Sequence, residues 1–134
     1  MAKERIKKIV GRISRDVAIR YNLYELEGQE IVQSLDLYAH TFKHIKEFKS
    51  IDNYNNAVLN LEEILKNPYF AYYDKSRNSL QYFCEIDEYV CAVVKLKIRS
   101  KDDNYVSTIY PISKSKINKI KEKSYVIQED LETI

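Results

Sequence analysis

The sequence contains two histidines, His40 and His44, four positions apart in a segment with helical periodicity. On a helix with about 100° per residue, His44 falls at the border of the apolar stripe, whereas His40 lies further toward solvent. An imidazole at such a border can face a cleft and exchange a proton near neutral pH. His44 is therefore the candidate general acid or base, although a half-buried histidine without a chemical role would give the same pattern.

Metal and cofactor sites are not predicted. A histidine pair at this spacing can bind zinc, but the sequence offers no third ligand. Cys84 and Cys91 lie far from the histidines, and neither an HExxH motif nor a paired CxxC motif occurs. If Asp87-Glu88 forms a two-residue turn, Cys84 lies directly opposite Cys91 on the neighbouring strand. We predict that both are free, largely buried thiols rather than a disulfide. Only two glycines and two prolines are present, which excludes the Gly-rich phosphate loops of dinucleotide-binding and Walker proteins.

Cations and hydroxyl groups gather in the last predicted hairpin. With a four-residue loop at 101–104, Lys97 would lie opposite Thr108, and Lys95 opposite Tyr110. Lysines beside hydroxyl groups can hold a phosphodiester and stabilise the charge that develops when its phosphorus is attacked. Lysines that extend from a polar strand end into solvent would give the same pattern.

These residues are positioned by two helices followed by a run of strands. Ser34 is a plausible N-cap for the first helix, and the second helix should stop before Pro68. The predicted helices are 35–48 and 55–66, and the predicted strands are 69–74, 79–86, 89–99 and 105–111. The fold class is therefore α+β, with two helices packed on a four-stranded antiparallel sheet. We further predict a short basic helix at 6–13, a strand at 17–24, an extended piece at 30–33 and a terminal helix at 113–123.

Length and charge agree with one folded unit, 1–134. The chain is 45% hydrophobic and carries a net charge of only +2, but its basic residues are concentrated at the two ends. Residues 1–16 hold six basic and two acidic residues, and residues 113–124 hold five basic and one acidic, before an acidic tail. These ends could bind a polyanion, or they could be solvated surfaces. Without a long apolar segment or a signal peptide, the chain is expected to be cytoplasmic and to have no membrane partner.

Four segments resemble a known family when taken in order. They are SLDLYAHTFKHIKEF, LEEILKNPYFAYYDKSRNSLQYF, YVCAVVKLKI and VSTIYPIS. They combine a helical His-Ile pair, a helix ending in ILxNP, a strand with a lysine, and a Ser/Thr-containing strand that ends near Tyr-Pro. This arrangement resembles the phage-associated branch of the barnase, EndoU, colicin and RelE-like (BECR) nuclease superfamily over residues 30–113. The resemblance implies a metal-independent ribonuclease fold, often carried by phages or used as a toxin.

The resemblance also implies roles for individual residues. The helical histidine would be His44, the strand cation Lys95 or Lys97, and the hydroxyl residues Ser107, Thr108 and Tyr110. Residues expected to contact RNA are Lys49, Arg99, Lys114, Lys116 and Lys119. In one respect the chain departs from the pattern, because Phe48-Lys49 stands where related sequences often carry a second basic or histidine position.

Two functions are therefore open at this point. The first is an endoribonuclease of phage or toxin type, without a cofactor, that cleaves RNA to a 2′,3′-cyclic phosphate and could be controlled by an immunity or antitoxin protein. The second is a non-catalytic binding module on the same fold that blocks a host or phage factor. Both would use a basic face and an aromatic-rich sheet.

Overall fold

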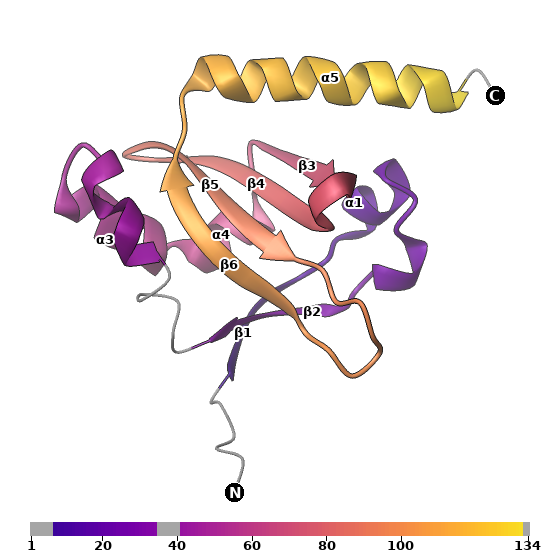
Figure 1. Cartoon of the computed structure of the whole chain (residues 1–134), viewed down its shortest axis with the longest axis horizontal. Coiled ribbons are helices and arrows are strands. Elements are labelled where there is room, and N and C mark those ends of the chain that lie inside the picture. The colour runs from indigo at the N-terminus through magenta and orange to yellow at the C-terminus, as the bar shows by residue number, and fades with distance from the viewer. Residues whose placement is uncertain (1–6, 35–40, 133–134) are drawn as a thin grey trace, which may run out of the picture.

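The computed structural model describes residues 7–34 and 41–132, which form a six-stranded sheet with helices against both faces (Figure 1). The strands are β1 (Lys7–Arg12), β2 (Glu30–Ser34), β3 (Phe70–Asp74), β4 (Ser79–Ile86), β5 (Glu88–Lys95) and β6 (Asn104–Pro111). Their order in the sheet is β1-β2-β6-β5-β4-β3, and β2 pairs with β6 in parallel, while the other pairs are antiparallel. The α+β class is confirmed, but the predicted four-stranded antiparallel sheet is wrong because β1 and β2 extend it through that parallel pair.

The helical segments are α1 (Arg15–Arg20), η1 (Tyr24–Leu26), η2 (Phe42–Glu47), α3 (Ile51–Leu59), α4 (Leu61–Lys66), η3 (Lys75–Arg77) and α5 (Lys114–Glu132), where η marks a 3-10 helix. The predicted helix at 55–66 is two helices that meet at Asn60, the second of which ends before Pro68 as expected. Most of the first half of the predicted helix at 35–48 lies outside the described residues, and its second half is the 3-10 helix η2. Ser34, expected to cap that helix, is instead the last residue of β2.

The first two elements are the reverse of the prediction, because the expected helix at 6–13 is strand β1 and the expected strand at 17–24 begins as helix α1. The β1–β2 register shifts between Ile9 and Gly11, and the two buried residues Val10, in β1, and Ile13, directly after it, are three positions apart rather than two. Such a bulge turns the two-residue spacing of a strand into a spacing of three, which resembles a helix. Helix α1 starts because the Ser14 hydroxyl accepts a hydrogen bond from the Val17 backbone N–H at 3.2 Å.

The sheet has two different faces. One face carries the main core, where β4, β5 and β6 pack against the helices that precede β3; its fully buried members include Leu80, Val94 and Ile109. The other face carries a smaller core of Phe70, Phe83, Cys91 and Val93 beneath Ile117 of α5. Figure 1 shows α5 lying across one end of the sheet, so this helix covers only part of its face. Within the described residues, no helix is both long and apolar enough to cross a membrane.

The β4–β5 hairpin sets the places of the two cysteines. Asp87 alone forms the turn, with a φ of 65°, whereas a two-residue turn was predicted. The register is therefore shifted by one position, and the predicted pairing of Cys84 with Cys91 is wrong. Cys84 lies opposite Val90 and packs toward the main core, whereas Cys91 belongs to the core beneath α5. Both cysteines are free thiols, as predicted.

Candidate active site

The part of the sheet that α5 leaves uncovered is built from β5 and β6, in a register that differs from the prediction. Lys95 lies opposite Tyr105 rather than Tyr110, and Lys97 lies beyond the end of β5 rather than opposite Thr108. The two predicted pairs are wrong because β5 ends earlier than expected, and the connection to β6 spans eight residues rather than four.

A β-bulge at Ser107 decides which side chains of β6 face the open side. The register shifts there, and the Ser107 hydroxyl donates a hydrogen bond to the Val93 carbonyl at 3.2 Å. The extra residue lets both Val106 and Ile109 point into the main core, although they are three positions apart. The opposite, open face of β6 then carries hydroxyl side chains at Tyr105, Thr108 and Tyr110. Among the described residues, the buried Thr108 Oγ1 has no hydrogen-bond partner.

Two pockets open beside these hydroxyl residues. The first, which we call the histidine pocket, has a volume of about 660 Å³ and lies between η2, the end of β6 and α5. Its polar lining includes His44, Glu47, Arg77, Gln81, Tyr110, Lys116 and Lys119. The pocket therefore combines an imidazole, a carboxylate, a phenol and three cations.

The 3-10 helix η2 is fixed at both ends, which places His44 in the histidine pocket. At its start, the Thr41 and Tyr54 hydroxyls are hydrogen bonded at 2.6 Å. At its end, Phe48 is 6% exposed and packs edge-on against the Tyr54 ring, with 5.5 Å between centroids. Between these anchors, the His44 ring lies 5.7 Å from the Tyr110 ring.

His44 is paired with a carboxylate that the sequence analysis did not select. Its Nδ1 atom contacts Glu47 Oε2, and the two side chains are 23% and 55% exposed. When Nδ1–H donates to this carboxylate, Nε2 carries the free lone pair and can accept a proton. The signal in the sequence is a carboxylate three positions after the histidine, a spacing that brings two side chains together on one helix face.

Tyr110 and Arg77 supply the other side of the histidine pocket. Burial raises the pKa of Tyr110, and its neighbour Cys91 raises it further, so the phenol stays protonated and can donate a hydrogen bond. Arg77 ends η3, directly before Asn78, which has a left-handed φ of 48°. Its side chain is 73% exposed, with Nε 3.8 Å from the Asp74 carboxylate. No pattern in the sequence indicates that Arg77 reaches this pocket.

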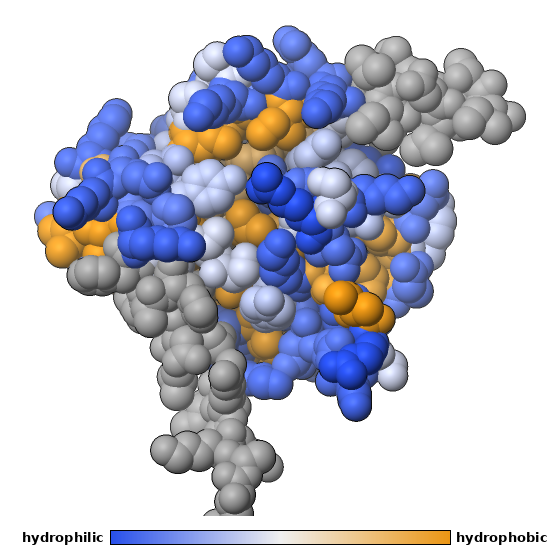
Figure 2. Space-filling model, viewed as in Figure 1, coloured by the Kyte–Doolittle hydropathy of each residue, from blue (hydrophilic) through white to orange (hydrophobic). Residues whose placement is uncertain are grey.

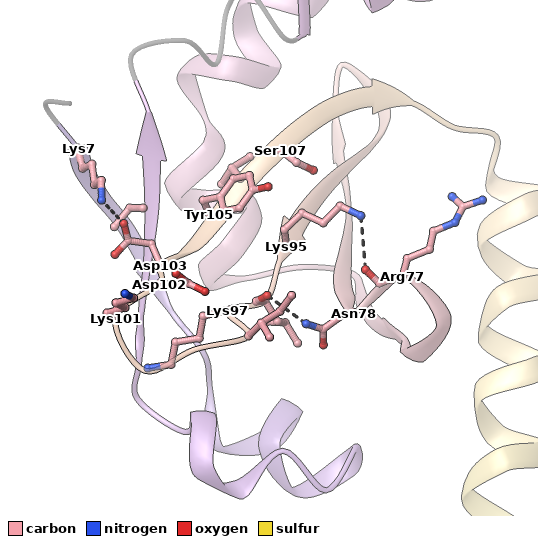
Figure 3. A pocket seen from close by; sticks show the side chains of 14 residues that line it. Lys7, Arg77, Asn78, Lys95, Lys97, Lys101, Asp102, Asp103, Tyr105 and Ser107 are labelled. Carbon is pink, nitrogen blue, oxygen red and sulfur yellow. Dashed lines mark hydrogen bonds and ion pairs between the residues drawn. The ribbon is translucent and has the colours of Figure 1, made fainter. Parts of the chain in front are cut away.

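The second pocket, which we call the lysine pocket, has a volume of about 730 Å³ and is shown in Figure 3. It lies between the β5–β6 connection, β6, the start of β1 and η3. Its charged and hydroxyl lining consists of Lys7, Arg77, Lys95, Lys97, Lys101, Asp102, Asp103, Tyr105 and Ser107. Hydrogen bonds from Arg99 hold the pKa of Asp102 below its usual range, so this carboxylate is ionised at neutral pH.

The structure thus divides the predicted site residues into groups. His44, Tyr110, Lys116 and Lys119 line the histidine pocket, whereas Lys95, Lys97 and Ser107 line the lysine pocket. Arg77, which was not predicted, lines both. The remaining predicted residues, Lys49, Arg99, Thr108 and Lys114, line neither pocket.

Two of the predicted residues outside the pockets, Arg99 and Lys114, contact neighbouring side chains instead. Arg99 is bound to Asp102 within the β5–β6 connection at 3.3 Å, and the Lys114 ammonium lies 5.9 Å from the centroid of the Tyr89 ring. In the part of the chain that the structure describes, three or more His, Cys, Asp or Glu side chains do not gather in a group that could hold a metal ion.

Figure 2 views the face that carries the uncovered part of the sheet: hydrophilic residues are mixed with smaller apolar areas in its middle, and apolar residues show beneath α5. Such a surface, with cations and hydroxyl groups beside an imidazole, suits a ligand that carries phosphate groups.

Comparison with known proteins gives this surface its context. Residues 7–119, from β1 into α5, match the family described as phage-Barnase-EndoU-ColicinE5/D-RelE like nuclease3. The match confirms the resemblance noted from residues 30–113 and extends it at both ends. Searches of curated proteins and of solved structures found no match. Because the family match covers most of the sequence, the chain belongs to this family of phage nuclease-like proteins.

Proposed function

We propose that the protein is a metal-independent endoribonuclease of phage or toxin type. The family supports a nuclease and a nucleic acid substrate. The observation that carries the finer proposal is the His44–Glu47 pair, which lies beside Tyr110 in one pocket with Arg77. An oriented imidazole beside cations and a phenol is an arrangement suited to proton transfer at a phosphodiester.

The proposed reaction is an internal transesterification. His44 Nε2 accepts the proton of a ribose 2′-OH, and the 2′-oxygen forms a bond to the adjacent phosphorus. The bond between phosphorus and the 5′-oxygen breaks, and that oxygen takes a proton from a donor in the pocket, either the Tyr110 phenol or an α5 lysine. The products are a 2′,3′-cyclic phosphate and a 5′-hydroxyl, so neither water nor a redox partner is consumed.

The cations of the histidine pocket would stabilise the charge on the phosphorane-like transition state. Lys116 and Lys119 follow one another on α5 at i, i+3, a spacing that turns both toward the pocket. The third cation, Arg77, reaches the pocket from η3, the turn between β3 and β4. Preorganised cations lower the activation free energy most when they lie where negative charge develops during the reaction, rather than where the substrate already carries it.

The test is cleavage of RNA by purified protein in excess EDTA. We expect wild type to cleave and His44→Ala to be at least about 100-fold slower, the scale of losing a general acid or base. His40→Ala, which removes the other imidazole of the chain, serves as the matched control and should change the rate far less. The 5′ fragment should end in a 2′,3′-cyclic phosphate.

Two results would contradict the proposal. One is a folded His44→Ala variant that cleaves as fast as wild type, which would remove the catalytic assignment. The other is a wild-type protein that cleaves none of a wide panel of RNAs, which would favour a binding module that blocks a host or phage factor. An immunity or antitoxin partner belongs to the proposal only if the protein is toxic when expressed, and that toxicity should be lost in His44→Ala.

A further inference from the structure

The lysine pocket takes no part in the proposed reaction, yet it is strongly cationic. Five cationic and two acidic side chains line it. Both carboxylates are already matched, because Asp103 pairs with Lys7, and Asp102 pairs with Arg99 from outside the lining. Arg77 also has a partner outside the lining, Asp74. Among the described residues, the unmatched charge of the lining therefore rests on Lys95, Lys97 and Lys101, which together favour an anionic ligand.

Buried polar residues hold the pocket in shape before any ligand arrives. Asn104 is 2% exposed; its side chain accepts a hydrogen bond from the Lys97 backbone N–H at 3.0 Å and donates one to the Glu30 carbonyl at 3.2 Å. Asn78 and Leu96 exchange two further bonds, from the Leu96 N–H to the Asn78 carbonyl at 3.0 Å and from Asn78 Nδ2 to the Leu96 carbonyl at 3.1 Å. The β5–β6 connection is thus fixed at both ends, which lowers the entropy lost when a ligand binds.

The lysine pocket also offers an aromatic ring. Tyr105 is 46% exposed on the open face of β6, and Figure 3 shows its ring beside the pocket, between Lys7 and Lys95. Ile98, another residue of the lining, is 87% exposed. An exposed ring next to cations is the combination that binds an unpaired base together with its phosphate.

Arg77 connects the two pockets. Figure 3 shows its carbonyl facing Lys95, at 3.4 Å from Lys95 Nζ, while its guanidinium points toward α5. Arg77 also lines the histidine pocket. Tyr105 and Tyr110, one beside each pocket, are five residues apart on β6, roughly 16 Å at about 3.3 Å per residue. One phosphate cannot reach both pockets, but consecutive nucleotides of one strand can.

We propose that the lysine pocket binds a nucleotide of single-stranded RNA a few positions along the strand from the one cleaved, with its base against Tyr105 and its phosphate on Lys97 and Lys101. This inference rests on the proposed function, because it takes the histidine pocket as the place of cleavage. It specifies the substrate as unpaired RNA, since a base within a duplex cannot stack on a side chain.

The experiment measures binding of a short 2′-O-methyl RNA strand, which lacks the attacking hydroxyl and cannot be cleaved by this route. We expect Tyr105→Ala to weaken binding about 10-fold, the loss expected for one base–aromatic stack. Lys97→Gln should lower the slope of log K against log salt by about 0.7, the share of one phosphate contact on a single strand. A duplex of the same 2′-O-methyl RNA should bind more weakly than the single strand. The affinity of the protein for this duplex should not change in Tyr105→Ala.

Matched controls lie outside both pockets. Tyr24, 60% exposed on η1, and Lys66, exposed on α4, line neither pocket, so Tyr24→Ala and Lys66→Gln should bind as wild type does. The inference is overturned if wild type does not bind the single strand, or if Tyr105→Ala and Lys97→Gln bind it as wild type does. If wild type cleaves RNA in that second case, the proposed function survives without this subsite. If binding depends on Tyr105 but no RNA is cleaved, the subsite stands and the proposed function fails.

Discussion

Replacement of Arg77 by glutamine tests the idea that one strand of RNA crosses both pockets. Because Arg77 lines both, the variant should lose a phosphate contact as well as positive charge near the reacting phosphorus. The first loss predicts a fall of about 0.7 in the slope of log K against log salt for a single strand. The second predicts a rate of cleavage at least about 100-fold lower, as measured when one preorganised donor of a transition-state oxyanion is removed elsewhere.

The fold should tolerate this change. Arg77 is 73% exposed, and the atoms of its ion pair with Asp74 are 3.8 Å apart. Exposed pairs of this kind contribute about 0 to 1 kcal/mol, so the thermal midpoint should move little. Thermal unfolding of the variant checks this before binding and cleavage are compared.

Arg15→Gln is the matched control for Arg77→Gln. Arg15 is 79% exposed and is also paired with a carboxylate at 3.8 Å, that of Glu27, but neither residue lines a pocket. We expect its salt slope and cleavage rate to stay near those of wild type. Equal effects of the two replacements would show that general surface charge, rather than the position of Arg77 between the pockets, determines RNA binding, and would refute the reasoning.

Three further outcomes follow from buried polar groups. Tyr82→Phe should raise the free energy of unfolding by about 1 kcal/mol, because the Tyr82 hydroxyl is buried without a hydrogen-bond partner among the described residues, and its removal leaves the ring in place. Tyr21→Phe should lower it by about 1 kcal/mol, because the Tyr21 hydroxyl donates to the Ala71 carbonyl at 2.7 Å; denaturant titration of both variants shows whether the signs differ. Burial raises the pKa of the Cys91 thiol to about 12 and raises that of the more exposed Cys84 less strongly, so at pH 8 an alkylating reagent that needs the thiolate should label Cys84 first. Mass spectrometry of the native protein over time measures that order, and equal labelling rates would contradict the burial of Cys91.

Local sequence signals determined much of the second half of the fold. The strand predicted at 79–86 is β4 with the same bounds, and the helix after 55 ends before Pro68, because proline restricts the residue that precedes it. The terminal basic helix is also confirmed, although α5 runs on to Glu132. These features depend on side-chain periodicity and on proline, which act over a few neighbouring residues.

Distant pairing decided what the local signals got wrong. The apolar residues of 6–13 have the spacing of a helix, but residues 7–12 form a strand because β2 lies beside them, and a bulge in β1 leaves the buried Val10 and Ile13 three positions apart. Strand β2 in turn joins the sheet through a short parallel pair with β6, more than 70 positions later in the chain. No periodicity within either segment encodes such a contact, because the free energy of pairing comes from the partner strand.

The candidate site divides in the same way. The sequence by itself indicated His44, Tyr110, Lys95, Lys97 and the lysines of α5 as candidate residues, since that choice depends on residue type and family pattern. Only the tertiary structure decided which of them meet. The bulge at Ser107 turns the β6 hydroxyl residues to the open face, the long β5–β6 connection moves Lys97 away from His44, and the η3 turn brings Arg77 between the two pockets. A one-residue shift in a strand moves a side chain to the other face of the sheet, so the composition of a site on a sheet is set by register, and register is fixed only when the strands pair.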